Sequence, residues 1–230
     1  MKNIGLFTAA LLTIIISACT GAKAPKAETL KTGDLIFFGL KADYLPEDNT
    51  MATAIADATG KDSVNLIHVA IAEVEADSVW IIDATIAHGC DRHPIDTTFK
   101  DFTLKDGSLP LFFVKRLPDS VDVKAAVERA KLLCGQPYDV HFLPDNGALY
   151  CSELVRESFL DSRGNNIFRN KPMNFKNSSG DFPQYWVWLF DKLGEPIPQD
   201  IPGTNPQDMF EDPILTDIDI DITPRTAEGL

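Results

Sequence analysis

Residues 65–85 read NLIHVAIAEVEADSVWIIDAT, two apolar runs joined by a short polar segment. Runs of this length around a polar turn predict an antiparallel hairpin, with strands at 66–74 and 79–85. Other apolar runs predict strands at 35–38 and 111–114, and apolar residues at helical spacing predict helices at 120–133 and 150–162. A helix is also compatible with the Ala-rich residues 50–58. A β-meander with packed helices indicates an α+β fold.

A polar residue interrupts the apolar run of each hairpin strand, His68 in the first and Asp83 in the second. If the turn centres on Glu75 and Ala76, these two residues lie directly opposite each other. A shift of two residues would place them diagonally but still on one face, and only a one-residue slip would separate them. A histidine in this position could also be a core residue bonded to backbone, so the hairpin alone assigns no role.

Cys151 begins the predicted helix 150–162, where free backbone N–H groups and the positive end of the helix dipole favour a thiolate. It could equally be the first residue of that helix's buried stripe. A cysteine nucleophile needs a base within reach, and the base needs an orienting group. His68 and Asp83 could serve as that base and orienting group, and His141, in the loop before the helix, is the second candidate for the base.

The N-terminus predicts export and lipidation. Lys2 precedes a nearly uncharged apolar run at 4–16, which is too short to span a bilayer comfortably and is typical of a secretory leader. The run ends in ISAC at 16–19, which resembles the bacterial lipobox, in which Cys19 is lipidated and becomes the first residue. We therefore expect a signal peptide at 1–18, a lipid tether at 19–31, one domain at 32–215 and an acidic tail at 216–230. The predicted location is the bacterial cell envelope, at its periplasmic or outer-membrane face.

The excess of acidic side chains argues against nucleic acid as a partner. The 230 residues carry 34 acidic and 21 basic side chains, for a net charge of -13, whereas a nucleic-acid binder usually has a basic face. The excess acid is consistent with solubility alone. The oligomeric state is left open.

A second polar cluster contains His88, Cys90, Asp91 and His93, ligand types that suit zinc. Its spacing matches no closed metal motif, and a polar loop explains it equally well, so we assign no metal and no cofactor. An exported protein can form disulfides, but spacing alone does not show whether Cys90 pairs with Cys134.

Several segments together resemble a known family. GDLIFF at 33–38 with HVAI at 68–71 resembles the strand pair of NlpC-like papain-fold peptidases, and GQPY at 135–138 with CSELV at 151–155 resembles their nucleophile segments. Here the histidine precedes the cysteine, as in the circularly permuted branch, the YiiX/YaeF-like amidases, many of which are lipoproteins. PGT at 202–204 and PQD at 206–208 resemble the C-terminal segment of that branch. The resemblance implies a papain-like half-barrel packed with helices.

The resemblance also implies roles for individual residues. Cys151 is expected to be the nucleophile, His68 the general base and Asp83 the third member. Tyr138 is expected to line the oxyanion site beside the backbone N–H of Cys151, and Ser152 to contact the substrate. The implied activity is hydrolysis of amide bonds through a thioester, in peptidoglycan stem peptides or other small peptides.

Two alternatives remain open. One is a lipid acyl-ester hydrolase or acyltransferase similar to the lecithin-retinol-acyltransferase-like proteins, since the same catalytic groups serve both chemistries and the fold does not separate them. A wide apolar groove beside the cysteine would favour this alternative, and a narrow polar pocket would favour peptides. The other is a non-catalytic envelope binding module.

Overall fold

The computed structural model describes residues 29–44, 50–59 and 63–224. The predicted signal peptide and Cys19 therefore lie outside the described residues. Within them, no helix has both the length and the apolar character needed to cross a membrane.

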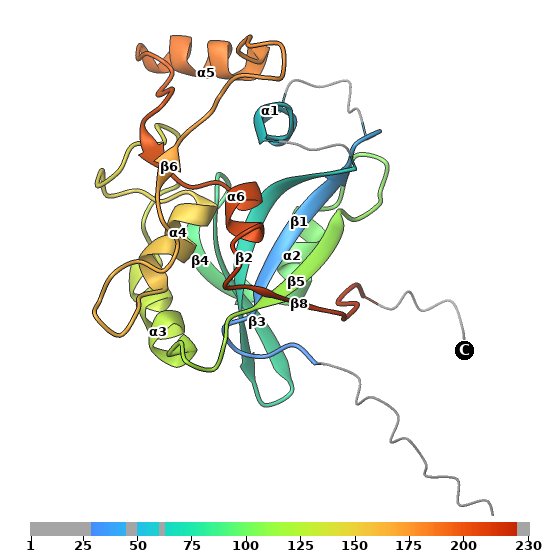
Figure 1. The fold of residues 1–230 in the computed structure, drawn as a ribbon. Coiled ribbons are helices and arrows are strands. Elements are labelled where there is room, and N and C mark those ends of the chain that lie inside the picture. Colours follow the sequence, from blue (N-terminus) through green and yellow to red (C-terminus); the bar gives the residue numbers. More distant parts are fainter. Residues whose placement is uncertain (1–28, 45–49, 60–62, 225–230) are drawn as a thin grey trace, which may run out of the picture.

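The centre of the fold is a six-stranded antiparallel sheet with the order β4-β3-β2-β1-β5-β8 (Figure 1). Its strands are β1 (Leu35–Lys41), β2 (Val64–Glu75), β3 (Ser78–Thr85), β4 (Gly89–Pro94), β5 (Leu111–Arg116) and β8 (Thr216–Ile218). The short strands β6 (Lys171–Pro172) and β7 (Pro202–Gly203) pair separately. The helices are α1 (Met51–Thr59), α2 (Ile95–Asp101), α3 (Val123–Leu133), α4 (Cys151–Ser158), α5 (Gln184–Leu193) and α6 (Pro206–Phe210).

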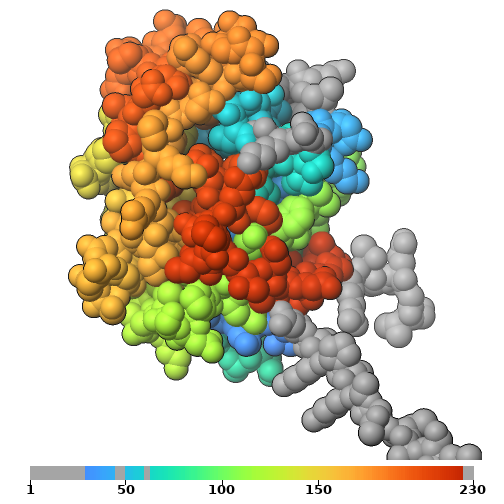
Figure 2. Space-filling view, in the orientation of Figure 1, coloured from blue at the N-terminus to red at the C-terminus, as the bar shows by residue number. Residues whose placement is uncertain are grey.

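Helices cover both faces of the sheet, which is why β1 is apolar without interruption. Leu35 and Phe37 of β1 pack with α3, α4 and α6 on one face, while Ile36 and Phe38 pack with α1 and α2 on the other. A third cluster joins α1 to α5 through Trp186 and neighbouring aromatic residues. The later part of the chain, coloured orange to red, covers much of the face seen in Figure 2. The α+β fold predicted from the sequence is confirmed.

The predicted hairpin is present, but its turn lies one residue later than the predicted turn at Glu75 and Ala76. Ile71 pairs with Ile82 and Glu75 with Ser78, so the turn lies at Ala76 and Asp77. Ala76 takes a positive φ of 51°, which completes this tight turn. The change displaces each cross-strand partner by two residues, so every side chain stays on the face of the sheet that was predicted for it.

Three segments differ from expectation. The predicted helix at 150–162 ends at Ser158, because Phe159 takes extended backbone with φ -98° and ψ 101°. The polar residues expected in a loop after His88 form β4 and α2. The first three residues of the predicted acidic tail form β8, where Asp217 Oδ1 lies 2.9 Å from Lys115 Nζ.

Candidate active site

Cys151 is the first residue of α4, and only 5% of its surface is exposed. Tyr150 precedes it in extended backbone and makes no side-chain cap, so the first backbone N–H groups of α4 receive no bond from that side chain. Leu154 and Val155 of the same helix are fully buried and fix its position against the sheet. The sequence places the thiol where developing negative charge is stabilised.

His68 and Asp83 are in direct contact, with 2.7 Å between Nε2 of the imidazole and Oδ2 of the carboxylate. The register places Asp83 two residues diagonally from His68 on the same face, which confirms the predicted contact. A bulge helps to aim the imidazole, since Phe38 pairs with His68 and Gly39 with Leu66, so Ile67 has no opposite residue.

Electrostatics link the same imidazole to Cys151. Burial lowers the pKa of His68, but the charge of Cys151, a hydrogen bond with Asp83 and a hydrogen bond with Cys151 together raise it to about 10. Because Nε2 is bonded to Asp83, the ring atom left for the sulfur is Nδ1. Two phenyl rings hold the ring plane, those of Phe38 and Phe102, with centroids 4.9 Å and 4.8 Å away. The arrangement can hold a thiolate beside an imidazolium.

Tyr138 and Ser152 both line the space around Cys151. The hydroxyl of Tyr138 donates to Met51 Sδ at 3.5 Å, and burial together with the Cys151 charge raises its pKa well above the usual value. A neutral phenol remains able to donate a hydrogen bond to developing negative charge. Ser152 is 1% exposed, and its Oγ accepts from Thr204 Oγ1 at 3.1 Å. The Ser152 hydroxyl therefore acts as an acceptor toward Thr204.

Asp139 also positions this site, a role that the sequence did not assign to it. It is fully buried and accepts bonds from the backbone N–H of His141 and Leu143 and from Asn146 Nδ2. It thereby closes the loop that connects Tyr138 to α4. Its sequence signal was the string PYD at 137–139, which resembles the permuted branch. The second candidate base, His141, instead contacts Glu195, with 2.8 Å between Nδ1 and Oε2 at the surface.

A pocket opens beside the sulfur of Cys151. Most of its wall is apolar or aromatic and comes from α1, α5 and the loops around residues 142 and 175, and its polar groups are hydroxyls and amides. No charged side chain occurs among the described residues that line it. Its apolar side chains include Ile55, Phe142, Met173, Phe175 and Trp186. The pocket therefore suits an uncharged, apolar group.

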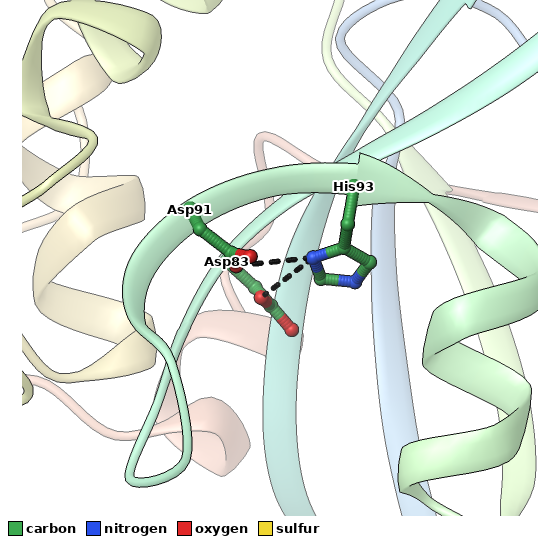
Figure 3. A group of neighbouring side chains, drawn as sticks. All are labelled: Asp83, Asp91 and His93. Carbon is green, nitrogen blue, oxygen red and sulfur yellow. Dashed lines mark hydrogen bonds and ion pairs between the residues drawn. The ribbon is translucent and has the colours of Figure 1, made fainter.

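The second polar cluster does not stay together. His88 is exposed and contacts Asp101, with 3.1 Å between Nε2 and Oδ2. Cys90 is buried in the core on the opposite face of β4 from Asp91 and His93. Those last two approach Asp83, a residue outside the original cluster (Figure 3). The four residues therefore do not form one metal site.

Cys90 and Cys134 are neighbours, a proximity that the sequence did not reveal. Gly135 N–H donates to the carbonyl of Cys90 at 2.7 Å, and both cysteines are free thiols. A hydrogen bond with Cys134, together with burial, raises the pKa of Cys90 far above its usual value. The same hydrogen bond lowers the pKa of Cys134.

The family model described as the permuted papain-like amidase enzymes of the YaeF/YiiX, C92 family matches residues 29–219. The chain belongs to this family. As a C92 member it has a permuted papain-like fold and falls in a class of cysteine amidases, which supports a hydrolase function. Both the fold and the family resemblance stated above are thereby confirmed.

Two proteins from Escherichia coli illustrate the C92 relationship. The uncharacterized protein YiiX of strain K12 is 23% identical over 211 residues, which cover 90% of this chain and 93% of YiiX. A crystal structure titled as that of the metalloprotein YiiX from O157:H7 has a TM-score of 0.61 and 20% identity, and the match covers 82% of this chain and 96% of that one. This structural match shows the shared fold.

Thiol labelling can test the reactivity of Cys151 in this C92 protein. We expect iodoacetamide at neutral pH to modify Cys151 faster than Cys90 or Cys134, because the adjacent imidazole of His68 can take the proton of the thiol. Cys134 is the stringent comparison, since it is more exposed and its pKa is lowered. Mass spectrometry after limited labelling measures the three rates. Equal or slower labelling of Cys151 in the native protein would contradict the thiolate–imidazolium pair, and denatured protein provides the control in which the preference should vanish.

Proposed function

We propose that this protein is a cysteine amidase that cleaves small peptides, peptidoglycan stem peptides among them. The thiolate of Cys151 attacks the amide carbon, and the protonated His68 gives its proton to the leaving amine. Water then hydrolyses the thioester, with His68 taking a proton from it. The observation that carries this proposal is the imidazole of His68 held between Cys151 and Asp83.

Two further groups support the attack. The backbone N–H of Cys151 and the hydroxyl of Tyr138 are the donors we assign to the oxyanion, because both belong to the surroundings of the sulfur at the N-terminus of α4. The Tyr138 hydroxyl would exchange its bond to Met51 Sδ for one to the oxyanion. Asp83 stabilises the charged form of the imidazole and keeps Nδ1 toward the sulfur. Ser152 lines the pocket and accepts a hydrogen bond from Thr204, so its own hydroxyl hydrogen is the group we propose for contact with the substrate.

A second candidate is hydrolysis or transfer of an apolar acyl group, and the pocket is the observation that favours it. A charged peptide end placed among Ile55, Phe142 and Trp186 would lose its hydration without gaining a charged partner. An alkyl chain or an apolar side chain would gain about 25 cal/mol for each Å² buried. The pocket therefore predicts a substrate whose group nearest the sulfur is uncharged.

The experiment compares three substrates: muropeptides, a medium-chain acyl anilide and the matching acyl ester. Cleavage of muropeptides without the acyl compounds supports the peptide amidase, whereas the reverse result replaces it with the acyl enzyme. Ala58→Asp places a carboxylate on the pocket wall, and we expect it to lower kcat/KM for the acyl anilide by about 10-fold or more. Ala125→Asp on α3 is the matched control and should change nothing.

The predicted anchor provides a separate test. We propose that the protein is tethered to the bacterial envelope through lipid on Cys19, which would keep it near cell-wall substrates. Cys19→Ser should move the protein from the membrane fraction to the soluble fraction and leave hydrolysis by the domain unchanged. Fractionation followed by immunoblotting measures the shift. A Cys19→Ser protein that stays in the membrane fraction would rule out this tether.

The solved YiiX structure is titled a metalloprotein, and we propose that this chain also binds a metal ion. Because nucleophilic attack by a thiolate needs no metal ion, we assign such an ion a positioning role outside the Cys151 pocket.

A further inference from the structure

Asp83 has one carboxylate oxygen that the contact with His68 leaves unused. Oδ2 bonds the imidazole, while Oδ1 has no hydrogen-bond partner although the side chain is fully buried. A buried charged oxygen without a partner is costly, so native proteins seldom leave one unsatisfied. This oxygen points away from the active site, toward β4.

Two residues of β4 face the unused oxygen. Asp91 pairs directly with Asp83 across the sheet, and His93 follows on the same face. The Nδ1 atom of His93 lies 3.0 Å from Asp91 Oδ1 and 4.0 Å from Asp83 Oδ1, so the three side chains converge on one point (Figure 3). One ligand atom from each residue lies within 4.8 Å of the other two.

The other nitrogen of His93 is already held. Nε2 lies 2.9 Å from Oγ1 of Thr98, a buried residue of α2. Nδ1 lies within hydrogen-bond distance of Asp91 Oδ1, to which an Nδ1–H would donate. When an ion takes the place of that proton, Nε2–H donates to the Thr98 hydroxyl and the Nδ1 lone pair is directed at the ion. Histidine ligands of metal ions are commonly held through the second ring nitrogen in this way.

We infer that Asp83, Asp91 and His93 form a binding site for one divalent transition-metal ion of the Zn²⁺ class. Imidazole and carboxylate ligands bind zinc at about 2.0–2.2 Å, which requires ligand atoms roughly 3–4 Å apart. The two carboxylates balance the charge of the ion, and the half-exposed Asp91 leaves it a route from solvent and room for a water ligand. The ion would satisfy Asp83 Oδ1 and join β3 to β4 while Oδ2 keeps its bond to His68.

The test measures binding directly and needs no activity. Full-length protein carrying Cys151→Ala, which removes the reactive thiol, is freed of metal and titrated with Zn²⁺ by calorimetry, with bound metal counted by mass spectrometry. We expect one ion per chain. Asp91→Asn, a substitution of nearly equal size at a partly exposed position, should weaken binding by at least about 10-fold, and His93→Gln should do the same. Because the nucleophile is absent throughout, the outcome is independent of the proposed hydrolase function.

A matched pair at the surface provides the control. His88 and Asp101 also form a histidine–carboxylate contact, but no second carboxylate joins them among the described residues, so Asp101→Asn should not change Zn²⁺ affinity. Co²⁺ is the spectroscopic probe, and its spectrum should show nitrogen and oxygen ligands. Absence of binding, equal binding by Asp91→Asn, or a cobalt–thiolate band from Cys90 and Cys134 would each overturn the site. If no ion binds, or if Asp91→Asn binds it equally well, the three side chains are held together by hydrogen bonds of His93 and not by a metal ion.

Discussion

Replacing Cys151 with Ala is expected to lower kcat/KM by about 10⁴-fold or more, the largest effect we predict. The thiolate forms the bond to the carbonyl carbon, so its removal leaves only substrate binding and the oxyanion donors. Cys151→Ser should also be nearly inactive, since a hydroxyl is far less acidic than a thiol beside the same imidazole. The measurement is turnover of the best substrate from the three-compound comparison.

Cys134→Ala is the matched control for this prediction. Cys134 is also a free thiol, but it lies beside Cys90 instead of His68. Its replacement should leave kcat/KM unchanged within a few-fold. Thermal unfolding of each variant excludes loss of fold as the cause. Activity that survives in well-folded Cys151→Ala protein would end the assignment of the nucleophile and favour a non-catalytic or differently catalysed function.

The contact between His68 and Asp83 was predictable because it depends only on both side chains lying on the same face of a hairpin. Both residues break apolar strands, and an antiparallel pair keeps them on one face for any even shift in register. The turn lies at Ala76 and Asp77, one residue later than the turn assumed in the prediction. This displaces the cross-strand partner of each residue by two positions, an even number, so His68 and Asp83 remain in contact. The alternation of residues along the two hairpin strands was therefore sufficient to predict the contact between the base and its orienting carboxylate.

The position of Cys151 against His68 could not be obtained in the same way. The helix α4 and the strand β2 are separated by more than seventy residues, and no periodicity relates them. Only the resemblance of the CSELV and HVAI segments to the permuted family joined the two. The structure then shows the physical link, a buried imidazole whose pKa is raised by the sulfur and by Asp83.

Non-local pairing explains the missed elements. The segment that became β4 is polar, and its pairing with β3 places Asp91 and His93 beside polar Asp83 instead of in an apolar core. β8 lies in an acidic stretch, and it forms because Asp217 contacts Lys115 and Ile218 is buried against β5. Neither partner can be identified from the segment itself. For the same reason the sequence did not show that Asp83 lies beside Asp91 and His93. A complete set of metal ligands could therefore not be recognised from the sequence.

Asp83→Asn is expected to lower kcat by about 10²–10⁴-fold while changing KM less, because the carboxylate orients the base and stabilises its charge without touching the substrate. In the native protein Oδ2 accepts from Nε2–H, so Nδ1 is the atom presented to Cys151. An amide nitrogen in the Oδ2 position would donate to Nε2 and move the ring proton to Nδ1, which could then no longer accept the thiol proton. The loss should stay below that of Cys151→Ala.

A purely structural role for Asp83 makes a different prediction, and the pH dependence of labelling separates the two. If the carboxylate stabilises the imidazolium, Asp83→Asn lowers the pKa of His68 from about 10, so the imidazole takes the thiol proton less readily and alkylation of Cys151 slows. A change that only loosened packing would leave the alkylation profile unshifted or would speed labelling through greater exposure. Asp101→Asn, at the exposed contact with His88, provides the matched control and should behave like the parent. Parent-like kcat and a parent-like alkylation profile in Asp83→Asn would show that His68 works without this carboxylate.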